Sequence, residues 1–516
     1  MPQTRNAIVS NAIQLITYVD RLGGNIAGIT SLLNNEFHGL FSGVHLLPFF
    51  DPIDGADAGF DPVNHTLVDS RLGNWDDVTV LANEYSVMAD LIVNHVSADS
   101  EQFKDVRRHG RKSPFWKLFL RKSDVFPNGD SALEESEDIR RIYRPRPGYP
   151  FTPIQLDNGD FLNFWTTFSD KQLDINVESP VGHEYLTSIL EQFARAGVRE
   201  IRLDAAGYAI KRRGTSCFML PETFEFIAAL SSQANDHGIA TLVEIHSHYR
   251  TQIEIASQVG RVYDFALPPL VLHSLYTSDA EPLKRWLTIS PRNCVTVLDT
   301  HDGIGIVDVA AQGELDGLLT DQQTDELVET IHEKTEGKSR KASGQAASNL
   351  DIYQVNSTYY NALGRNDTDY LLARSIQFFS PGRPQVYYVG LLAGENDLDL
   401  MTRTGVGRDI NRHYYTPDEI DTALKRPVVR NLMKLMRFRN ESAAFDGIFS
   451  LPDCQSDQLI LRWDGKETFA QLHVDLDQRC ATIDYEQSGV TGRICVTDQG
   501  VTQLLQRGGS KMTVPA

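Results

Sequence analysis

Cysteine is scarce in this chain. Five cysteines occur in 516 residues, an odd number, and none pairs with another at CxxC spacing. Small secreted scaffolds stapled by disulfides, and thiolate metal or redox sites, need cysteines in closer and more numerous pairs. We therefore expect reduced thiols in a cytoplasmic protein. The five are Cys217, Cys294, Cys454, Cys480 and Cys495.

Long apolar runs and an excess of basic residues are also missing. No run reaches the length of a membrane span, and the stretch from Met1 to Tyr18 lacks the apolar region and cleavage site of a signal peptide. Lysine and arginine number 49 against 69 acidic residues, a net charge of -20. This balance argues against nucleic acid and against an anionic membrane surface as partners.

What the chain does contain is a regular alternation of two patterns. With 41% hydrophobic residues, its 516 residues suffice for a large globular domain plus appendages. Short apolar runs typical of strands alternate with helical patterns, as in βα units around a parallel sheet. The expected strands cover 13–19, 43–50, 88–93, 198–204, 240–246, 262–267, 294–299 and 385–389. Eight such units predict an α/β fold, a (β/α)8 TIM barrel.

Two stretches interrupt the alternation, and a third ends it. Residues 94–179, rich in proline, arginine and aromatics, predict an inserted loop-rich domain, and the acidic residues 304–365 predict a second, loop-like insert. From residue 444 to 516, short alternating runs predict a C-terminal all-β domain. The barrel is thus expected in three parts, at 1–93, 180–303 and 366–443.

Asp204 ends one of the expected buried strands. Acids in this position face the mouth of a parallel β/α structure, where active sites collect. Arg202 lies two residues earlier, so both side chains point to the same face of the strand. A guanidinium keeps a neighbouring carboxylate ionised, and an ionised carboxylate can act as a nucleophile. Taken alone, the pair is equally well interpreted as a buried structural ion pair.

Two further acids make the catalytic interpretation stronger. Glu244 lies near the end of the expected strand 240–246, and Asp302 comes shortly after the expected strand 294–299, so all three carboxylates should converge at one rim of the barrel. Cleavage of a glycosidic bond with retention needs one carboxyl group to attack the anomeric carbon and another to protonate the leaving oxygen. A third carboxylate can bind ring hydroxyls and hold the sugar in a distorted shape. The sequence therefore predicts a glycoside-cleaving site.

Several motifs resemble those of a known family. Four segments at barrel strand ends are similar to the four motifs of the α-amylase superfamily of glycoside hydrolases: ADLIVNH, IRLDAAGY, LVEIH and LDTHD. Four more, in the barrel and in both inserts, resemble the sucrose phosphorylases within it: GADAGFDP, IYRPRPG, LDIYQVNSTYY and GRDINRHYY. The resemblance covers nearly the whole chain and weakens only in the C-terminal β domain.

The resemblance implies a role for each matching residue. Asp204 would be the nucleophile, Glu244 the general acid/base and Asp302 the stabiliser of the transition state. Phe60 and Phe168 would form an apolar platform for the sugar. The other implied substrate-binding residues are Asp57, His95, Gln172, Arg202, His301, Asp351, Ile352, Gln354 and Arg408. The implied phosphate-binding residues are Arg146, His246 and Tyr353.

The implied reaction is the phosphorolysis of sucrose. Sucrose and inorganic phosphate would give α-glucose 1-phosphate and fructose through a β-glucosyl-enzyme intermediate, with side transfer of glucose to other acceptors. The resemblance implies no cofactor and no metal, and it suggests a homodimer. Asn94 in the first motif could be interpreted as a calcium ligand, as in many amylases, but no acidic residue nearby supports this.

Three alternatives stay open at this point. The chain could act on another glucoside, namely sucrose 6'-phosphate, glucosylglycerol or glucosylglycerate, although Asp351 and Ile352 are a poor match for an anionic acceptor. It could be a plain hydrolase or transglucosidase, which would not need Arg146. It could also be a non-catalytic barrel subunit, but such subunits lose the catalytic acids and carry a membrane anchor.

One pocket must serve fructose first and phosphate afterwards. Arg146 lies between prolines, a stiff setting that fixes the direction of a side chain suited to gripping phosphate at two points. Asp351 suits fructose hydroxyls but would repel an incoming phosphate. We therefore expect the segment that contains Asp351 and Tyr353 to move after fructose leaves, withdrawing Asp351 and bringing Tyr353 beside Arg146.

Overall fold

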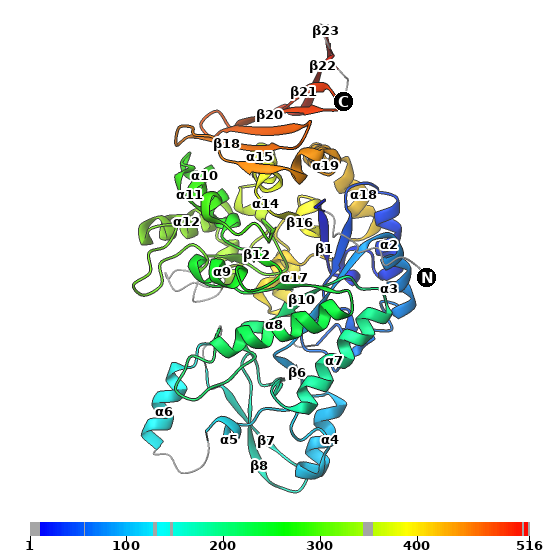
Figure 1. Ribbon diagram of the computed structural model, residues 1–516, viewed down its shortest axis with the longest axis vertical. Helices are drawn as coiled ribbons and strands as arrows, with labels where there is room; N and C mark the ends of the chain where they lie inside the picture. The colour runs from blue at the N-terminus through cyan, green and yellow to red at the C-terminus, as the bar shows by residue number, and fades with distance from the viewer. Residues whose placement is uncertain are drawn as a thin grey trace.

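A computed structural model describes residues 11–55, 57–126, 132–144, 148–343, 354–507 and 510–513 (Figure 1). At 132–135, 505–507 and 510–513 the description covers the backbone only. Four predicted site residues lie outside the described residues: Arg146, Asp351, Ile352 and Tyr353. The movement expected of the segment that contains Asp351 and Tyr353 stays a prediction. Within the described ranges, no helix combines the length and the apolar character needed to cross a bilayer.

The centre of the molecule is a closed barrel of eight parallel strands. Neighbouring strands follow the order β1-β16-β13-β12-β11-β10-β5-β2. The barrel is closed because β1, the first barrel strand in the sequence, pairs both with β2 and with β16, the last one. This confirms the predicted TIM barrel. The strands are β1 (Gln14–Thr17), β2 (Gly43–Leu46), β5 (Ser86–Ile92), β10 (Glu200–Asp204), β11 (Ala240–Val243), β12 (Val262–Asp264), β13 (Cys294–Thr296) and β16 (Arg383–Tyr387).

Alternation along the strands fills the barrel interior in layers. Glu200 and Arg202 share one face of β10, and all five residues of that strand are buried. At the N-terminal end of the barrel, Glu200 pairs with Arg383 at 2.6 Å, and Gln14 donates to the same carboxylate. An apolar cluster that contains Met88, the register partner of Glu200, lies beside these polar residues. Arg202 and its partners form the next layer, at the mouth.

Helices cover the outside of the barrel (Figure 1). Several begin with a side-chain cap, such as Asn74, which forms a capping box with Asp77 at the start of α3. The covering helices with eight or more residues are α2 (Ile26–Asn34), α3 (Trp75–Glu84), α7 (Pro180–Arg195), α8 (Pro221–Asp236), α9 (Tyr249–Ala256), α10 (Leu267–Thr277), α11 (Glu281–Ile289), α15 (Asp367–Phe379), α18 (Pro417–Lys425) and α19 (Pro427–Glu441).

Two expectations about elements are wrong. The strand expected to reach residue 267 ends at Asp264, and α10 follows it, with nine of its eleven residues buried. An apolar helix that is buried on every side shows no amphipathic period in the sequence. The second insert is not loop-like: it contains α12 (Asp321–Lys334), which opens with a capping box between Thr320 and Gln323, and α13 (Lys338–Ser343).

The first insert and the C-terminal domain lie at opposite ends of the molecule (Figure 1). The insert contains strands, and β6 (His95–Ser97) pairs with β9 (Gln172–Asp174) where it meets the barrel. The predicted C-terminal all-β domain is confirmed as an antiparallel sheet, in which each strand from β17 (Ile448–Ser450) to β23 (Ser510–Thr513) pairs with the next along the chain. The domain boundaries expected from the sequence stay a prediction.

Candidate active site

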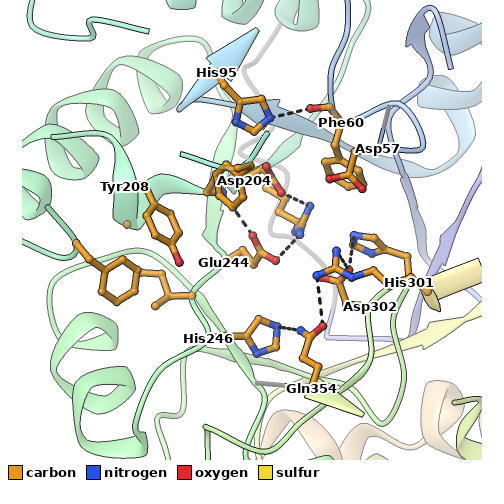
Figure 2. A pocket seen from close by; sticks show the side chains of 17 residues that line it. Asp57, Phe60, His95, Asp204, Tyr208, Glu244, His246, His301, Asp302 and Gln354 are labelled. Atoms are coloured by element: carbon orange, nitrogen blue, oxygen red, sulfur yellow. Dashed lines mark hydrogen bonds and ion pairs between the residues drawn. The ribbon is translucent and has the colours of Figure 1, made fainter. Parts of the chain in front are cut away.

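A pocket opens at the carboxyl ends of the barrel strands. Figure 2 shows its side chains converging from the barrel loops and from the inserts. Most of the sequence-predicted residues that the structure describes line it. The lining residues are Asp57, Phe60, His95, Phe168, Arg202, Asp204, Ala205, Gly207, Tyr208, Phe218, Glu244, Ile245, His246, His301, Asp302, Gln354 and Arg408.

The three predicted carboxylates come together here. Asp204 is the last residue of β10, and Glu244 comes directly after β11. Asp302 lies six residues beyond the end of β13, in the loop that follows it. Ala205 has a left-handed backbone with φ of 54°, which turns the chain sharply after Asp204. Its backbone N–H donates to Glu244 Oε2 at 3.4 Å and so links the two strand ends.

One guanidinium joins the first two carboxylates. Arg202 Nη1 lies 3.1 Å from Asp204 Oδ1, and Arg202 Nη2 lies 2.6 Å from Glu244 Oε1. Asp90, on the neighbouring strand β5, holds Nη1 from the other side at 2.5 Å and is itself bound by His45 at 3.1 Å. The predicted common face of Arg202 and Asp204 is thus observed, and the same guanidinium also orients Glu244.

Burial and charge act in opposite directions on Asp204. Burial raises the pKa of its carboxyl group, and the carboxylates of Glu244, Asp90 and Asp302 add to the rise, while Arg202 lowers it. The net pKa lies well above the usual range for aspartate. A positive charge that develops beside Asp204, as on the anomeric carbon of a reacting glycoside, would favour its ionised form.

Asp302 is held in its ionised form. Burial by itself would raise the pKa of this carboxyl group, but Arg408 and Arg412 outweigh burial and hold the pKa below its usual range. Arg408 Nη1 lies 2.6 Å from Asp302 Oδ1, and Arg412 Nη2 lies 3.6 Å from the same oxygen. His301, next in the chain, is buried and has a pKa well below its usual value, so its imidazole is neutral.

Two aromatic rings and two histidines form the wall beside Asp204. Phe60 stacks on His301 with ring centroids 5.0 Å apart, and its carbonyl oxygen accepts a hydrogen bond from His95 Nε2 at 2.9 Å. Phe168 packs against His95 at 5.2 Å. Gln172 does not line the pocket: it is buried behind His95, with its amide nitrogen 3.2 Å from His95 Nε2.

Sequence reasoning missed an aromatic cluster that continues this wall from Phe168. Tyr208 packs against Phe168 with ring centroids 5.2 Å apart and against Phe218 with centroids 4.8 Å apart. Tyr143, from the first insert, stacks on Tyr208. Tyr208 could have been suspected because it lies four residues after Asp204 in the same motif. Phe218 gives no such signal, because only tertiary packing brings its loop to the pocket.

The side of the pocket predicted for phosphate is partly described. His246 Nδ1 donates to Asp308 Oδ2 at 3.0 Å, and Gln354 Nε2 lies 3.2 Å from His246 Nε2. Burial alone would lower the pKa of His246, but the Asp308 carboxylate outweighs it and raises the pKa. Gln354 Oε1 in turn accepts from Arg408 Nη2 at 3.5 Å. A network of polar side chains therefore connects His246 to Asp302.

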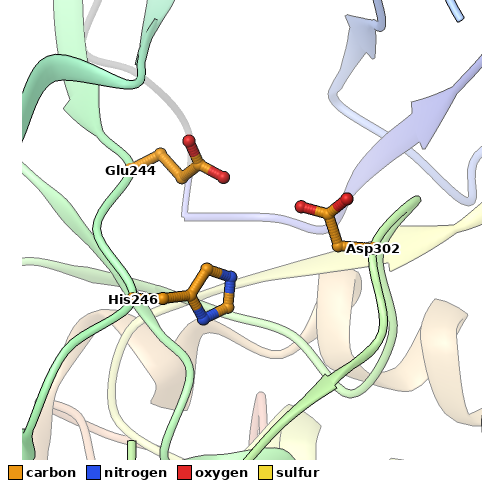
Figure 3. A group of neighbouring side chains, drawn as sticks. All are labelled: Glu244, His246 and Asp302. Carbon is orange, nitrogen blue, oxygen red and sulfur yellow. The ribbon is translucent and has the colours of Figure 1, made fainter. Parts of the chain in front are cut away.

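Among the described residues, one group of side chains has the spacing of a metal site. Ligand atoms of Glu244, His246 and Asp302 lie within 4.8 Å of one another (Figure 3). However, Arg202 lies 2.6 Å from Glu244 and Arg408 lies 2.6 Å from Asp302. Guanidinium groups already neutralise both carboxylates, so the donor set is a poor fit for a further cation.

Comparison with known proteins agrees with the fold. The catalytic-domain profile of the alpha-amylases matches residues 5–267. The closed parallel barrel with a C-terminal antiparallel sheet matches the fold of that family. The chain belongs to the alpha-amylase family, which confirms the resemblance seen in the sequence.

More similar relatives lie within one branch of the family. The chain is 58% identical to a sucrose phosphorylase of Agrobacterium vitis over 92% of this chain and 97% of the relative. It is 53% identical to a sucrose phosphorylase of Bifidobacterium adolescentis over 90% and 92%. The crystal structure of a sucrose 6F-phosphate phosphorylase from Thermoanaerobacter thermosaccharolyticum superposes with a TM-score of 0.87 and 36% identity, covering 95% of this chain and 99% of that one.

Proposed function

We propose that this enzyme transfers the glucosyl group of sucrose to inorganic phosphate. The observation that carries the proposal is the convergence of Asp204, Glu244 and Asp302 on one pocket, with Arg202 joining the first two. Two carboxyl groups that share a guanidinium fit the close pair of a retaining enzyme, roughly 5 Å apart, better than the wider pair of an inverting one. The 58% identity to a sucrose phosphorylase supports sucrose as the donor.

In the first step, the bond between glucose and fructose breaks. Asp204 attacks the anomeric carbon in its ionised form, with the proton of the Asp204–Glu244 pair residing on Glu244, and the electron pair of the broken bond goes to the fructose oxygen. Glu244 gives its proton to that oxygen, because an alkoxide would leave too slowly. Fructose departs as a neutral molecule, and glucose remains bound to Asp204 as a β-glucosyl ester.

In the second step, phosphate takes the place of fructose. A phosphate oxygen attacks the anomeric carbon, the ester bond breaks, and Asp204 recovers its negative charge. Glu244, now ionised, can accept a proton from hydrogen phosphate. Two inversions at the same carbon give α-glucose 1-phosphate. His246 lies on this side of the pocket, and we assign phosphate binding to it together with Arg146 and Tyr353.

The remaining lining residues bind and shape the glucosyl ring. Asp302, held ionised by Arg408, can accept hydrogen bonds from ring hydroxyls and stabilise the positive charge of the transition state. Phe60 and Phe168 offer apolar faces to the ring, and His95 offers a polar edge. The proposal includes a homodimer and a cytoplasmic location.

The main alternative is a related acceptor. The structural relative described above acts, by its name, on sucrose 6F-phosphate. An acceptor with a phosphate would favour cationic side chains on the fructose side of the pocket. Among the pocket-lining residues, the two arginines contact carboxylates: Arg202 binds Glu244, and Arg408 binds Asp302. Identity also favours unmodified sucrose, because the chain is 58% identical to a sucrose phosphorylase and 36% identical to the relative that acts on the phosphorylated sugar.

One assay tests the proposal. The enzyme is incubated with sucrose or with sucrose 6'-phosphate, each with and without inorganic phosphate, and glucose 1-phosphate and free glucose are quantified. We expect glucose 1-phosphate from sucrose only when phosphate is present. Free glucose alone would identify a hydrolase, and a preference for sucrose 6'-phosphate would identify the alternative.

A further inference from the structure

A buried ammonium group lies behind the pocket wall. Lys211 follows Asp204 by seven residues, in the loop between η2 (Ala206–Tyr208) and α8, and its side chain is 3% exposed. Its Nζ donates to Asn94 Oδ1 at 3.0 Å, contacts Asp174 Oδ2 at 2.8 Å, and donates to the carbonyl oxygen of Tyr208. An ammonium has three N–H donors, so these three oxygens occupy all of them.

Two of these partners connect Lys211 directly to the pocket. Asn94 immediately precedes His95, whose ring lines the pocket. Tyr208 lines the pocket with its own ring, and Lys211 holds its backbone. The ammonium therefore joins the side chain of Asn94, which follows β5, to the backbone of Tyr208, which follows β10.

The third partner connects Lys211 to the first insert. Asp174 Oδ1 accepts a hydrogen bond from the backbone of Thr167 at 2.9 Å, and its Oδ2 accepts from the hydroxyl of Thr167 at 2.6 Å. Phe168 is the next residue and lines the pocket. Lys211 Nζ also lies 5.5 Å from the ring centre of Trp165, within cation–π distance. The insert is thus fixed to the barrel next to the sugar site.

We propose that Lys211 is a positioning residue for the glucosyl site. It acts through its three partners, which are Asn94, Asp174 and the carbonyl oxygen of Tyr208. Through them it positions the pocket-lining side chains of His95, Phe168 and Tyr208. The inference deepens the proposed function, because it rests on the glucosyl group binding in this pocket.

The structure predicts a selective effect when the ammonium is lost. His246, on the phosphate side, is held by Asp308 and Gln354, and neither of these contacts Lys211. Sugar binding and turnover should therefore suffer while phosphate binding is spared. A displacement of about 1 Å in residues that orient a substrate costs roughly a hundredfold in rate.

The test is Lys211→Ala with chemical rescue. Lys211 borders a surface cleft together with Leu120, Ala209 and Arg212, so a small amine added to the solution can reach the vacated space. We expect KM for sucrose and for glucose 1-phosphate to rise at least tenfold and kcat to fall, with KM for phosphate within twofold. Propylammonium should restore part of the loss, and n-propanol, of similar size but uncharged, should not.

Lys117→Ala is the matched control. Lys117 borders the same cleft, is exposed, and lies in the first insert, so its removal should change neither KM nor kcat. The proposal is overturned if Lys211→Ala keeps KM for sucrose within twofold. It is also overturned if the variant loses sucrose and phosphate affinity in parallel and propylammonium restores neither, because a general loss of structure predicts that result.

A second variant keeps the proposal testable if Lys211→Ala does not fold. Lys211→Met combined with Asp174→Asn removes both charges of the buried pair, so no unpaired charge is left inside. This double variant must show the same selective rise in KM for the sugars, and equal changes for sugar and phosphate would overturn the proposal. If the wild-type enzyme yields only free glucose, the proposed function fails, while Lys211 can still be tested by the rescue of glucose release.

Discussion

Asp204 shares Arg202 with two other acids, so it can be replaced without leaving that guanidinium unpaired. Asp204→Asn keeps the shape of the side chain, and Arg202 retains Asp90 and Glu244. An amide is a far poorer nucleophile than a carboxylate, so turnover should fall on the order of 10⁴-fold while the protein still folds. Glucose 1-phosphate release and thermal unfolding measure the two effects. A folded variant with a tenth of wild-type turnover would contradict the assignment.

Glu244→Gln separates protonation of the leaving group from the other steps. Sucrose should hardly be cleaved, because the fructose oxygen needs the proton that Glu244 supplies. An α-glucosyl fluoride should lose much less activity, because fluoride leaves with little help. The ratio of kcat/KM for the two substrates is the measurement. Equal losses on both would show that Glu244 is not the acid.

At the scale of single residues, sequence reasoning succeeded where strand geometry dictates position. The carboxyl ends of parallel strands meet at one rim, so the pattern of strands is enough to place Asp204 and Glu244 together. It failed where tertiary packing determines which side chains reach the pocket. Gln172 lies one layer behind His95 instead of in the pocket, and Phe218 reaches the pocket from a loop with no periodic pattern.

At the scale of elements, the errors have two physical causes. The apolar helix α10 is buried all round, so its sequence lacks the one-sided period by which helices are found. The helix α12 was hidden by its acidic composition, although its capping box of Thr320 and Gln323 and its buried Leu327 and Ile331 mark it in retrospect. The strand assignments were correct in number. Seven of the eight were overlong at their C-terminal ends, where the chain turns into the pocket loops, and the exception is the strand that ends at Asp204.

The junction of β12 and α10 should make stability depend on pH. Asp264 Oδ1 accepts from Leu267 N at 3.0 Å and from Trp286 Nε1 at 2.9 Å, and burial raises the pKa of the carboxyl group to about 7. The pKa of Asp264 in the folded protein exceeds its pKa in the unfolded chain. The stability that comes from the proton held by folded Asp264 is therefore complete below about pH 4, and it is lost as the pH rises from there through about 7. The loss amounts to at most about 4 kcal/mol.

Asp264→Asn tests this dependence. The amide oxygen can keep both hydrogen bonds, and the amide nitrogen takes the place of the protonated oxygen. The free energy of unfolding, measured by denaturant between pH 5 and 8, should fall less steeply with pH in the variant than in the wild type. Asp321→Asn, at the exposed start of α12, should follow the wild-type curve. Identical slopes for all three proteins would show that Asp264 is ionised throughout.

At the scale of the whole molecule, the barrel and the C-terminal sheet share one core. Buried residues of the barrel such as Phe379 and of the sheet such as Leu461 belong to a single apolar cluster. Trp463 lies at the junction: its Nε1 donates to the carbonyl oxygen of Phe379 at 2.7 Å, and its ring packs edge-on against Phe445. The composition shift near residue 444 predicts a separate domain, but it does not reveal that the barrel and the sheet share one apolar core.

A shared core predicts that both parts unfold together. Trp463→Ala should lower the free energy of unfolding by about 3–5 kcal/mol, because a large buried side chain and a hydrogen bond are lost. Calorimetry should show one transition at a lower temperature for the variant, with KM for sucrose unchanged because Trp463 is remote from the pocket lining. Ile448→Ala, whose side chain is 77% exposed on the neighbouring strand, should leave the transition where it is. Two transitions in the variant, with only one of them shifted, would mean that the sheet unfolds independently and that the continuous core does not couple it to the barrel.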